Sequence, residues 1–171
     1  MSKRSHEKTR TIYLIRHAIA AERGDKWPDD TLRPLTHDGA ARMRQVVRGL
    51  GQLEAVPGLI MTSPLVRAAS TAKLVAEGLT PAPDVITLPA LAPGSTPSRV
   101  VSALAPHNRR ESIALVGHEP DLGELAAWLI GARAPLAFKK GGVCRIDFDH
   151  WPPSQAGRLI WLATPRMLRA L

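Results

Sequence analysis

The chain of 171 residues carries 23 Lys and Arg against 15 Asp and Glu, which gives a formal net charge of +8, and it has one cysteine, Cys144. This length fits one compact domain that folds without disulfides or a structural metal, and a single cysteine excludes an internal disulfide. A hydrophobic share of 44% with 22% charged residues excludes a disordered chain. The positive charge favours anionic partners without choosing among them.

The chain begins with a basic segment, residues 1–10, that contains four Lys or Arg. The apolar run behind it, residues 12–15, is too short for the core of a secretory signal, and no apolar run approaches the ~20 residues that span a bilayer. We therefore expect a flexible, solvated N-terminus, one folded domain over residues 11–171, a cytoplasmic protein and no membrane contact.

Short apolar runs alternate along the chain with longer amphipathic stretches, which is typical of βαβ units. Six of the apolar runs are predicted strands, at residues 11–15, 59–62, 85–88, 113–117, 143–148 and 159–163. Four amphipathic stretches are predicted helices, at residues 36–53, 65–77, 97–105 and 120–130. The Pro-rich segment between the last two strands fits a hairpin. The sequence therefore predicts a single-domain α/β fold, a three-layer α/β/α sandwich with a mostly parallel central sheet and an antiparallel edge.

Hydroxyl residues precede three of the predicted helices. Thr36 is predicted to cap the first helix, because its side chain can accept a hydrogen bond from a free amide of the first turn. Ser63 and Thr96 are each followed by proline, which fits the first helical position, so they are predicted to cap the second and third helices.

Histidines and arginines stand at the ends of three predicted strands. Arg16 and His17 follow the first strand, His118 follows the fourth, and Arg67 begins the helix after the second. In an open α/β sheet, ligands bind beyond the carboxyl ends of the strands, where helix N-termini also favour anions. Each of these residues alone is also explained as a structural histidine or a surface cation. Their conjunction predicts that the four side chains converge on one anion-binding site.

Four ordered segments carry these residues: Leu-Ile-Arg-His-Ala at 14–18, Arg-Pro-Leu-Thr with a glycine at 33–39, Ser-Pro-Leu-Val-Arg-Ala with a threonine at 63–71, and Val-Gly-His-Glu-Pro at 116–120. Together they resemble the histidine phosphatase superfamily, the phosphoglycerate mutase-like proteins, and in particular its small SixA-type branch of phosphohistidine phosphatases. The resemblance spans residues 11–165. Ala18 departs from it, because family members usually have glycine there, but both residues are small.

The resemblance implies a phosphatase in which neutral His17 attacks the phosphorus and forms a phosphohistidine intermediate that water hydrolyses. Arg16, Arg67 and, by resemblance, Arg33 would clamp the phosphate with their planar guanidinium groups. His118 would be protonated or would donate a hydrogen bond to the transferring group. No cofactor is implied, and no metal site is expected because the other histidines lack ligand spacing.

A proton donor for the leaving group is harder to identify. Larger family members place a carboxylate after the third strand, whereas residues 88–95 of this chain contain no acid. The remaining candidates are Asp29 and Asp30 in the long loop before the first helix, which are also explained as a solvated pair. Glu119 and Asp121 are interpreted as partners of a helix dipole.

The sequence thus favours a phosphatase that acts on phosphohistidine in another protein. An imidazole leaving group needs less help from an acid than an alkoxide does, and the short chain lacks insertions that would cover a small metabolite. The alternative is a phosphomonoesterase acting on a small metabolite or nucleotide. A non-catalytic anion or nucleic-acid binder is disfavoured by the few aromatic residues. The expected partner is therefore a phosphorylated protein or small phosphorylated substrate, with no nucleic acid and no membrane.

Overall fold

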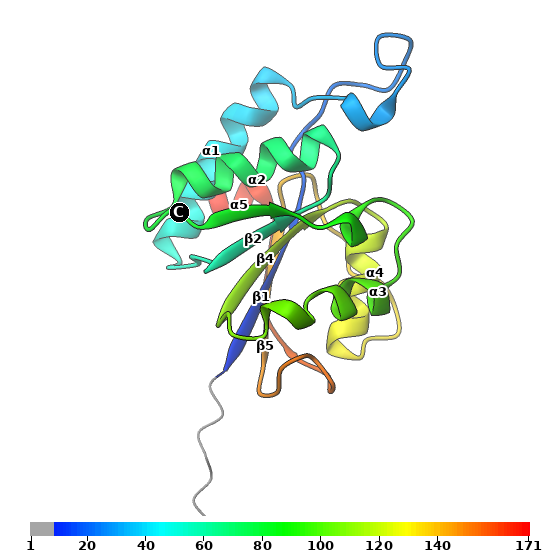
Figure 1. The fold of residues 1–171 in the computed structure, drawn as a ribbon. Coiled ribbons are helices and arrows are strands. Elements are labelled where there is room, and N and C mark those ends of the chain that lie inside the picture. Colours follow the sequence, from blue (N-terminus) through cyan, green and yellow to red (C-terminus); the bar gives the residue numbers. More distant parts are fainter. Residues whose placement is uncertain (1–8) are drawn as a thin grey trace, which may run out of the picture.

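The computed structural model describes residues 9–171 and contains a six-stranded sheet in the order β3-β2-β4-β1-β5-β6 (Figure 1). The strands are β1 (Arg10–Arg16), β2 (Leu59–Thr62), β3 (Asp84–Thr87), β4 (Ser112–Gly117), β5 (Val143–Phe148) and β6 (Arg158–Ala163). The first four strands of that order pair in parallel. β5 runs antiparallel to β1, and β6 runs antiparallel to β5. The predicted mostly parallel sheet with an antiparallel edge is confirmed.

Helices cover both faces of this sheet (Figure 1). One face carries α1 (His37–Gln52), α2 (Val66–Gly78) and α5 (Pro165–Arg169), and the other carries α3 (Pro97–Ala103) and α4 (Asp121–Ile130). Short 3-10 helices lie at Asp30–Leu32, Pro89–Leu91 and Ala105–His107. Because side chains alternate along a strand, Tyr13 and Ile15 of β1 pack into the first core cluster, whereas Ile12 and Leu14 pack into the second. The predicted three layers are therefore present.

The helix starts agree with the sequence in two of three cases. Thr36 Oγ1 accepts a hydrogen bond from the Gly39 amide at 2.9 Å, and Thr96 caps α3 in the same way. Ser63 does not cap α2, because that helix begins later and Leu65 holds its N-cap position without a side-chain bond. α5 was not predicted from the sequence, since five residues are too few to show an apolar period.

The N-terminal part of the predicted organisation is described only from residue 9 onward. Residues 1–8 of the predicted basic segment lie outside the described residues. β1 begins at Arg10, whose guanidinium donates to the carbonyls of Asn108 and Arg110. Over residues 9–171, no helix is both long enough and apolar enough to cross a membrane.

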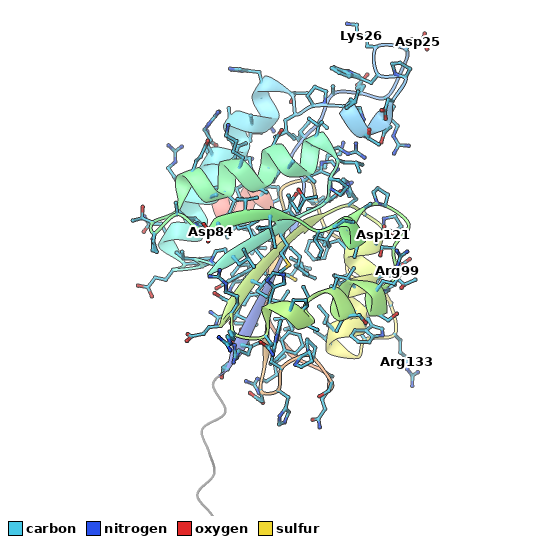
Figure 2. All side chains as sticks on the ribbon, in the orientation of Figure 1. Asp25, Lys26, Asp84, Arg99, Asp121 and Arg133 are labelled. Carbon is cyan, nitrogen blue, oxygen red and sulfur yellow. The ribbon has the colours of Figure 1, made fainter. Side chains whose placement is uncertain are left out.

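β1 and β4 are neighbours at the centre of the sheet and end together. Arg16 lies opposite Gly117 in the register, and the amide of His17 donates to the Gly117 carbonyl at 3.1 Å. The chain after β1 forms a long segment that projects beyond the sheet, with Asp25 and Lys26 at its tip (Figure 2). α1 packs closely on the start of this segment, because a Cβ at Gly39 would lie 2.1 Å from the Ile19 carbonyl oxygen. Only glycine allows that approach.

Candidate active site

A cavity of about 410 Å³ lies at the carboxyl ends of β1 and β4. Its lining includes the four side chains that were predicted to converge, Arg16, His17, Arg67 and His118, and also Arg33, which the family resemblance added. The other lining residues come from the projecting segment, from Pro93 and Glu119, and from Lys140 before β5. Within the part of the chain that the structure describes, no group of three or more His, Cys, Asp or Glu side chains is placed to hold a metal ion.

The imidazole of His17 is held in one tautomer. Its Nδ1 lies 2.7 Å from the carbonyl oxygen of Ala18, and a carbonyl only accepts hydrogen bonds, so Nδ1 carries the proton and Nε2 keeps its lone pair. Burial lowers the pKa of His17 to about 4, with help from the charges of Arg67 and Arg16 and against the Ala18 hydrogen bond. The ring is therefore neutral at physiological pH, which is the state a nucleophile requires.

The position of Ala18 is fixed from α2. The Ala18 amide donates to Thr71 Oγ1 at 3.0 Å, and the Thr71 hydroxyl donates to the Arg67 carbonyl at 2.7 Å. Thr71 is fully buried. One hydroxyl thus ties the chain after His17 to the helix that carries Arg67.

His118 lies beside His17, with ring centroids 5.2 Å apart. Its Nε2 is 2.8 Å from Ser63 Oγ, and that hydroxyl oxygen accepts from the Leu65 amide. The Ser63 hydroxyl can therefore donate to Nε2, which leaves the ring proton on Nδ1. This Nδ1 is buried and has no hydrogen-bond partner among residues 9–171. Burial, then the nearby His17 and Arg67, lowers the pKa of His118 to about 3. Of the two predicted states, the free protein therefore favours a neutral hydrogen-bond donor over a cation.

Arg67 and Arg33 share one carboxylate. Arg67 is 3% exposed, its Nη1 donates to the Asp30 carbonyl at 2.8 Å, and its Nη2 donates to Asp30 Oδ2 at 2.9 Å. Arg33 Nε donates to Asp30 Oδ1 at 2.9 Å, and Arg33 Nη1 donates to the Ala21 carbonyl at 2.7 Å. The two guanidinium groups are therefore oriented by charge-assisted hydrogen bonds before any ligand binds.

Arg16 is oriented from the opposite side of the cavity. Its Nη1 donates to the Phe138 carbonyl at 2.7 Å. The buried Nε atoms of Arg16 and Arg67 have no hydrogen-bond partner in the described part of the chain. Both arginines line the cavity, so their positive charges favour an anion there.

Asp29 and Asp30 do not have the environment of proton donors. Asp29 Oδ1 accepts from the amide and hydroxyl of Thr31, and these bonds lower the pKa of Asp29. Burial raises the pKa of Asp30, but the hydrogen bond from Arg33 and the charges of Arg67 and Arg33 outweigh it, so the net shift is downward. Both carboxylates therefore favour the ionised form, and Asp30 is a partner of arginines rather than half of a solvated pair.

Sequence reasoning did not place four further charged residues at the cavity, namely Glu22, Arg23, Glu119 and Lys140. Lys140 lies in the loop before β5, and the next amide, that of Gly141, donates to the carbonyls of Arg16 and His17. Glu119 was interpreted as a dipole partner of α4, but its side chain lines the cavity. The one available signal was its place directly after His118. Asp121 does lie in the first turn of α4, and its Oδ2 accepts from the Gly94 amide at 2.7 Å.

Known proteins similar to this chain include phosphatases. The family model described as "Histidine phosphatase superfamily (branch 1)" matches residues 12–92. An uncharacterized protein of Picosynechococcus sp. is 38% identical over 140 residues, which cover 77% of this chain and 81% of the relative. Phosphohistidine phosphatase SixA of Escherichia coli (strain K12) is 26% identical over 161 residues, which cover 92% of this chain and 96% of the relative.

Solved structures share the fold. The protein histidine phosphatase SixA complexed with tungstate superposes with a TM-score of 0.80 at 24% identity, covering 91% of this chain and 97% of that chain. The alpha-ribazole phosphatase from Shigella flexneri gives a TM-score of 0.69 at 18% identity and covers 91% and 96%. Both likenesses establish the α/β architecture.

Proposed function

Because the chain belongs to the histidine phosphatase superfamily, we propose that it is a phosphatase in which His17 forms a covalent phosphohistidine intermediate, and that its substrate is a phosphohistidine side chain of another protein. One observation carries the proposal. His17 is buried and neutral, its Nε2 has no hydrogen-bond partner among residues 9–171, and it lines the same cavity as three arginines.

The first half of the reaction follows from these contacts. The substrate phosphate would accept hydrogen bonds from the guanidinium groups of Arg16 and Arg67, which line the cavity, and Arg33 would add its charge. The lone pair of His17 Nε2 would form the new N–P bond in line with the P–N bond of the substrate, which breaks as its electron pair returns to the leaving imidazole. The arginines and a hydrogen bond from His118 would stabilise the charge on the equatorial oxygens, which is usually the largest single contribution to catalysis.

In the second half, water attacks the phosphohistidine, and the N–P bond breaks as the electron pair returns to His17. Inorganic phosphate is released, and the ring is again neutral with its proton on Nδ1. The Ala18 carbonyl keeps that proton in place in both halves of the reaction. One tautomer therefore serves the whole cycle.

Two observations support phosphohistidine as the substrate. Five cationic side chains line the cavity against two anionic ones, which favours a phosphoryl group carrying about two negative charges. The Escherichia coli relative, similar over 92% of this chain, is a phosphohistidine phosphatase. The cytoplasmic location remains a prediction from the sequence.

Replacement of the nucleophile tests the proposal. In His17→Ala, we expect turnover of both a phosphohistidine-bearing protein and an aryl phosphate to fall by at least ~10⁴-fold, because the covalent route is removed. Binding of tungstate, measured by calorimetry, should persist because the arginines remain. His37→Ala is the matched control, since His37 is an exposed residue at the start of α1.

Two results would contradict the proposal separately. If His17→Ala hydrolyses the aryl phosphate at the parent rate, His17 is not the nucleophile. If the parent enzyme hydrolyses the aryl phosphate but leaves the phosphohistidine protein intact, the substrate assignment is wrong while the mechanism stands.

A further inference from the structure

A second cavity, of about 50 Å³, lies where α1, α5 and the loop before β5 meet, and we call it the α1–α5 pocket. Its apolar lining includes Met43, Val46 and Pro165. The loop lies against both helices, because a Cβ at Gly141, whose φ is +80°, would be 3.6 Å from Met43 Sδ and 3.7 Å from Pro165 Cβ. A cavity of this size takes the end of one aliphatic side chain.

The α1–α5 pocket adjoins the catalytic cavity. Lys140 lines both cavities, and Ala18, which follows the proposed nucleophile, lines the pocket. The Gly141 amide donates to the carbonyls of Arg16 and His17 at 3.1 Å, so the loop between the two cavities is fixed to the end of β1. A ligand that is bound at His17 and extends past Lys140 therefore meets the pocket next.

Cations surround the pocket. Arg42, Lys140 and Arg169 belong to its lining, and all three residues are exposed. Oδ2 of Asp38 lies 2.8 Å from Arg42 Nε, and the Arg42 side chain is still 50% exposed. Asp38 is the one acid in α1, α5 and residues 139–142, which together carry seven Lys and Arg: Arg42, Arg44, Arg48, Lys139, Lys140, Arg166 and Arg169. This excess of positive charge favours carboxylates in a ligand.

We propose that the α1–α5 pocket binds a segment of the phosphorylated protein in which an apolar side chain is flanked by carboxylates. The proposal rests on the proposed function, because it takes a phosphohistidine protein as the substrate. The apolar side chain enters the pocket, and the carboxylates pair with Arg42 and Arg169. The pocket thereby selects among proteins that carry the same phosphorylated side chain.

A polypeptide fits these features better than other anions do. A small phosphate ester binds within the catalytic cavity of about 410 Å³ and does not need the pocket. Nucleic acid binds single-stranded sites through its phosphates and through stacking of its bases on aromatic rings, and none of the described residues that line the pocket is aromatic. An aliphatic side chain between two acids matches both the apolar lining and the cationic rim.

The test compares synthetic peptides that each contain a single phosphohistidine. The acidic peptides carry Glu-Leu-Glu at one to five residues from the phosphohistidine, on either side, and the best of these substrates is compared with a neutral peptide that has Gln in place of Glu. In the parent enzyme we expect kcat/KM to be ~3–30-fold higher on the acidic peptide, mainly through KM, because two exposed ion pairs each contribute modestly. Replacing the Leu of the peptide by Ser should lower kcat/KM by ~3–10-fold. Added salt should reduce the first difference more than the second.

The variant that tests the pocket combines Arg42→Gln with Arg169→Gln. We expect the two peptides to become equal within about 2-fold, while the rate on nitrophenyl phosphate stays within about 2-fold of the parent because neither arginine lines the catalytic cavity. The matched control combines Arg44→Gln with Arg48→Gln, which removes the same charge from exposed positions of α1 outside the pocket lining. The control should keep the parent's preference for the acidic peptide.

Three results would overturn the proposal. The first is a parent enzyme with no preference for the acidic peptide. The second is an equal loss of preference in both double variants, because net charge alone would then explain it. The third is an unchanged peptide preference in the pocket variant together with lost binding of a short single-stranded DNA, which would assign the cationic face to nucleic acid.

These failures are distinguishable from a failure of the proposed function. In each of the three cases, hydrolysis of the phosphohistidine peptides by the parent enzyme would leave the proposed function standing. If the parent enzyme hydrolyses nitrophenyl phosphate but none of the phosphohistidine peptides, the substrate of the proposed function is wrong, and the role of the pocket falls with it.

Discussion

The cavity is bordered by two regions that shift the pKa of a carboxyl group in opposite directions. In the projecting segment, Asp30 is bonded to Arg33 and Arg67, and its pKa is lowered. At the corner between β4 and α4, Glu119 is desolvated, Oε1 has no partner among the described residues, and its pKa is raised. Both residues lie near arginines, so a nearby cation alone does not set the direction of the pKa shift. Direct hydrogen bonds and burial decide it.

This difference separates two tasks that carboxyl groups perform in catalysis. An ionised group can orient cations, and a neutral group can deliver a proton, and one site often needs both. Here hydrogen bonds and charges lower the pKa of Asp30 in the projecting segment, whereas burial raises the pKa of Glu119 at the corner. The variants below act on the side of the projecting segment, and the titration that follows them reports on His17.

After His17→Ala, the largest effect is expected for Arg67→Lys, because Arg67 bonds the projecting segment through Asp30. Lysine keeps the charge but loses the planar fork whose two Nη atoms donate to Asp30. We expect kcat/KM on nitrophenyl phosphate to fall by ~10²–10³-fold, the loss typical for one donor to the transition state. Arg99→Lys on α3, at the surface (Figure 2), is the control. If Arg67→Lys keeps the kcat/KM of the parent enzyme, the guanidinium fork of Arg67 does not contribute to catalysis.

A smaller effect is expected for Asp30→Ala. Two arginines lose the carboxylate that orients them, and a charge-assisted hydrogen bond of this kind is worth ~1.5–3 kcal/mol. We expect kcat/KM to fall by ~10–100-fold, mainly through KM, with Asp30→Asn in between because one acceptor oxygen remains. Asp25→Ala at the tip of the same segment (Figure 2) is the matched control. An unchanged KM in Asp30→Ala would show that Asp30 does not orient the two arginines for the substrate.

The smallest effect concerns the protonation of His17. Burial disfavours the imidazolium form, so the ring should titrate at about pH 4 in the free protein rather than near the ordinary ~6.5. Between the lowered pKa and the ordinary pKa of histidine, the His17 ring therefore stays neutral and can act as a nucleophile. The measurement is an NMR titration of the His17 ring. A midpoint near the ordinary value would contradict the neutral nucleophile.

The residues that follow strands were predictable from the sequence. Arg16, His17 and His118 follow apolar runs directly, and parallel strands bring their carboxyl ends to one edge. The position of Arg67 was predicted by the same reasoning, because α2 begins shortly after β2 ends. These positions follow from the local hydrophobic periodicity, which a short stretch of sequence shows, and from the general topology of α/β sheets.

The remaining features depend on contacts between distant or irregular segments. Asp30 reaches Arg67 across 37 residues of sequence, from a segment with no regular period. Ser63 was predicted as a helix cap, but α2 begins later and its hydroxyl meets His118 instead. Glu119 was interpreted through the helix dipole, which describes the start of α4 but not the direction of a side chain at the preceding corner. The Gly141 amide donates to the carbonyls of Arg16 and His17, and these hydrogen bonds hold the neighbouring Lys140 at the cavity.

The stereochemical course at phosphorus tests the central claim most directly. An in-line transfer to His17 followed by an in-line attack of water inverts the phosphorus twice, so hydrolysis of an isotopically chiral phosphate ester should give net retention. This outcome does not require the intermediate to accumulate. Net inversion would mean that water attacks the substrate in one step, and it would contradict the covalent role of His17.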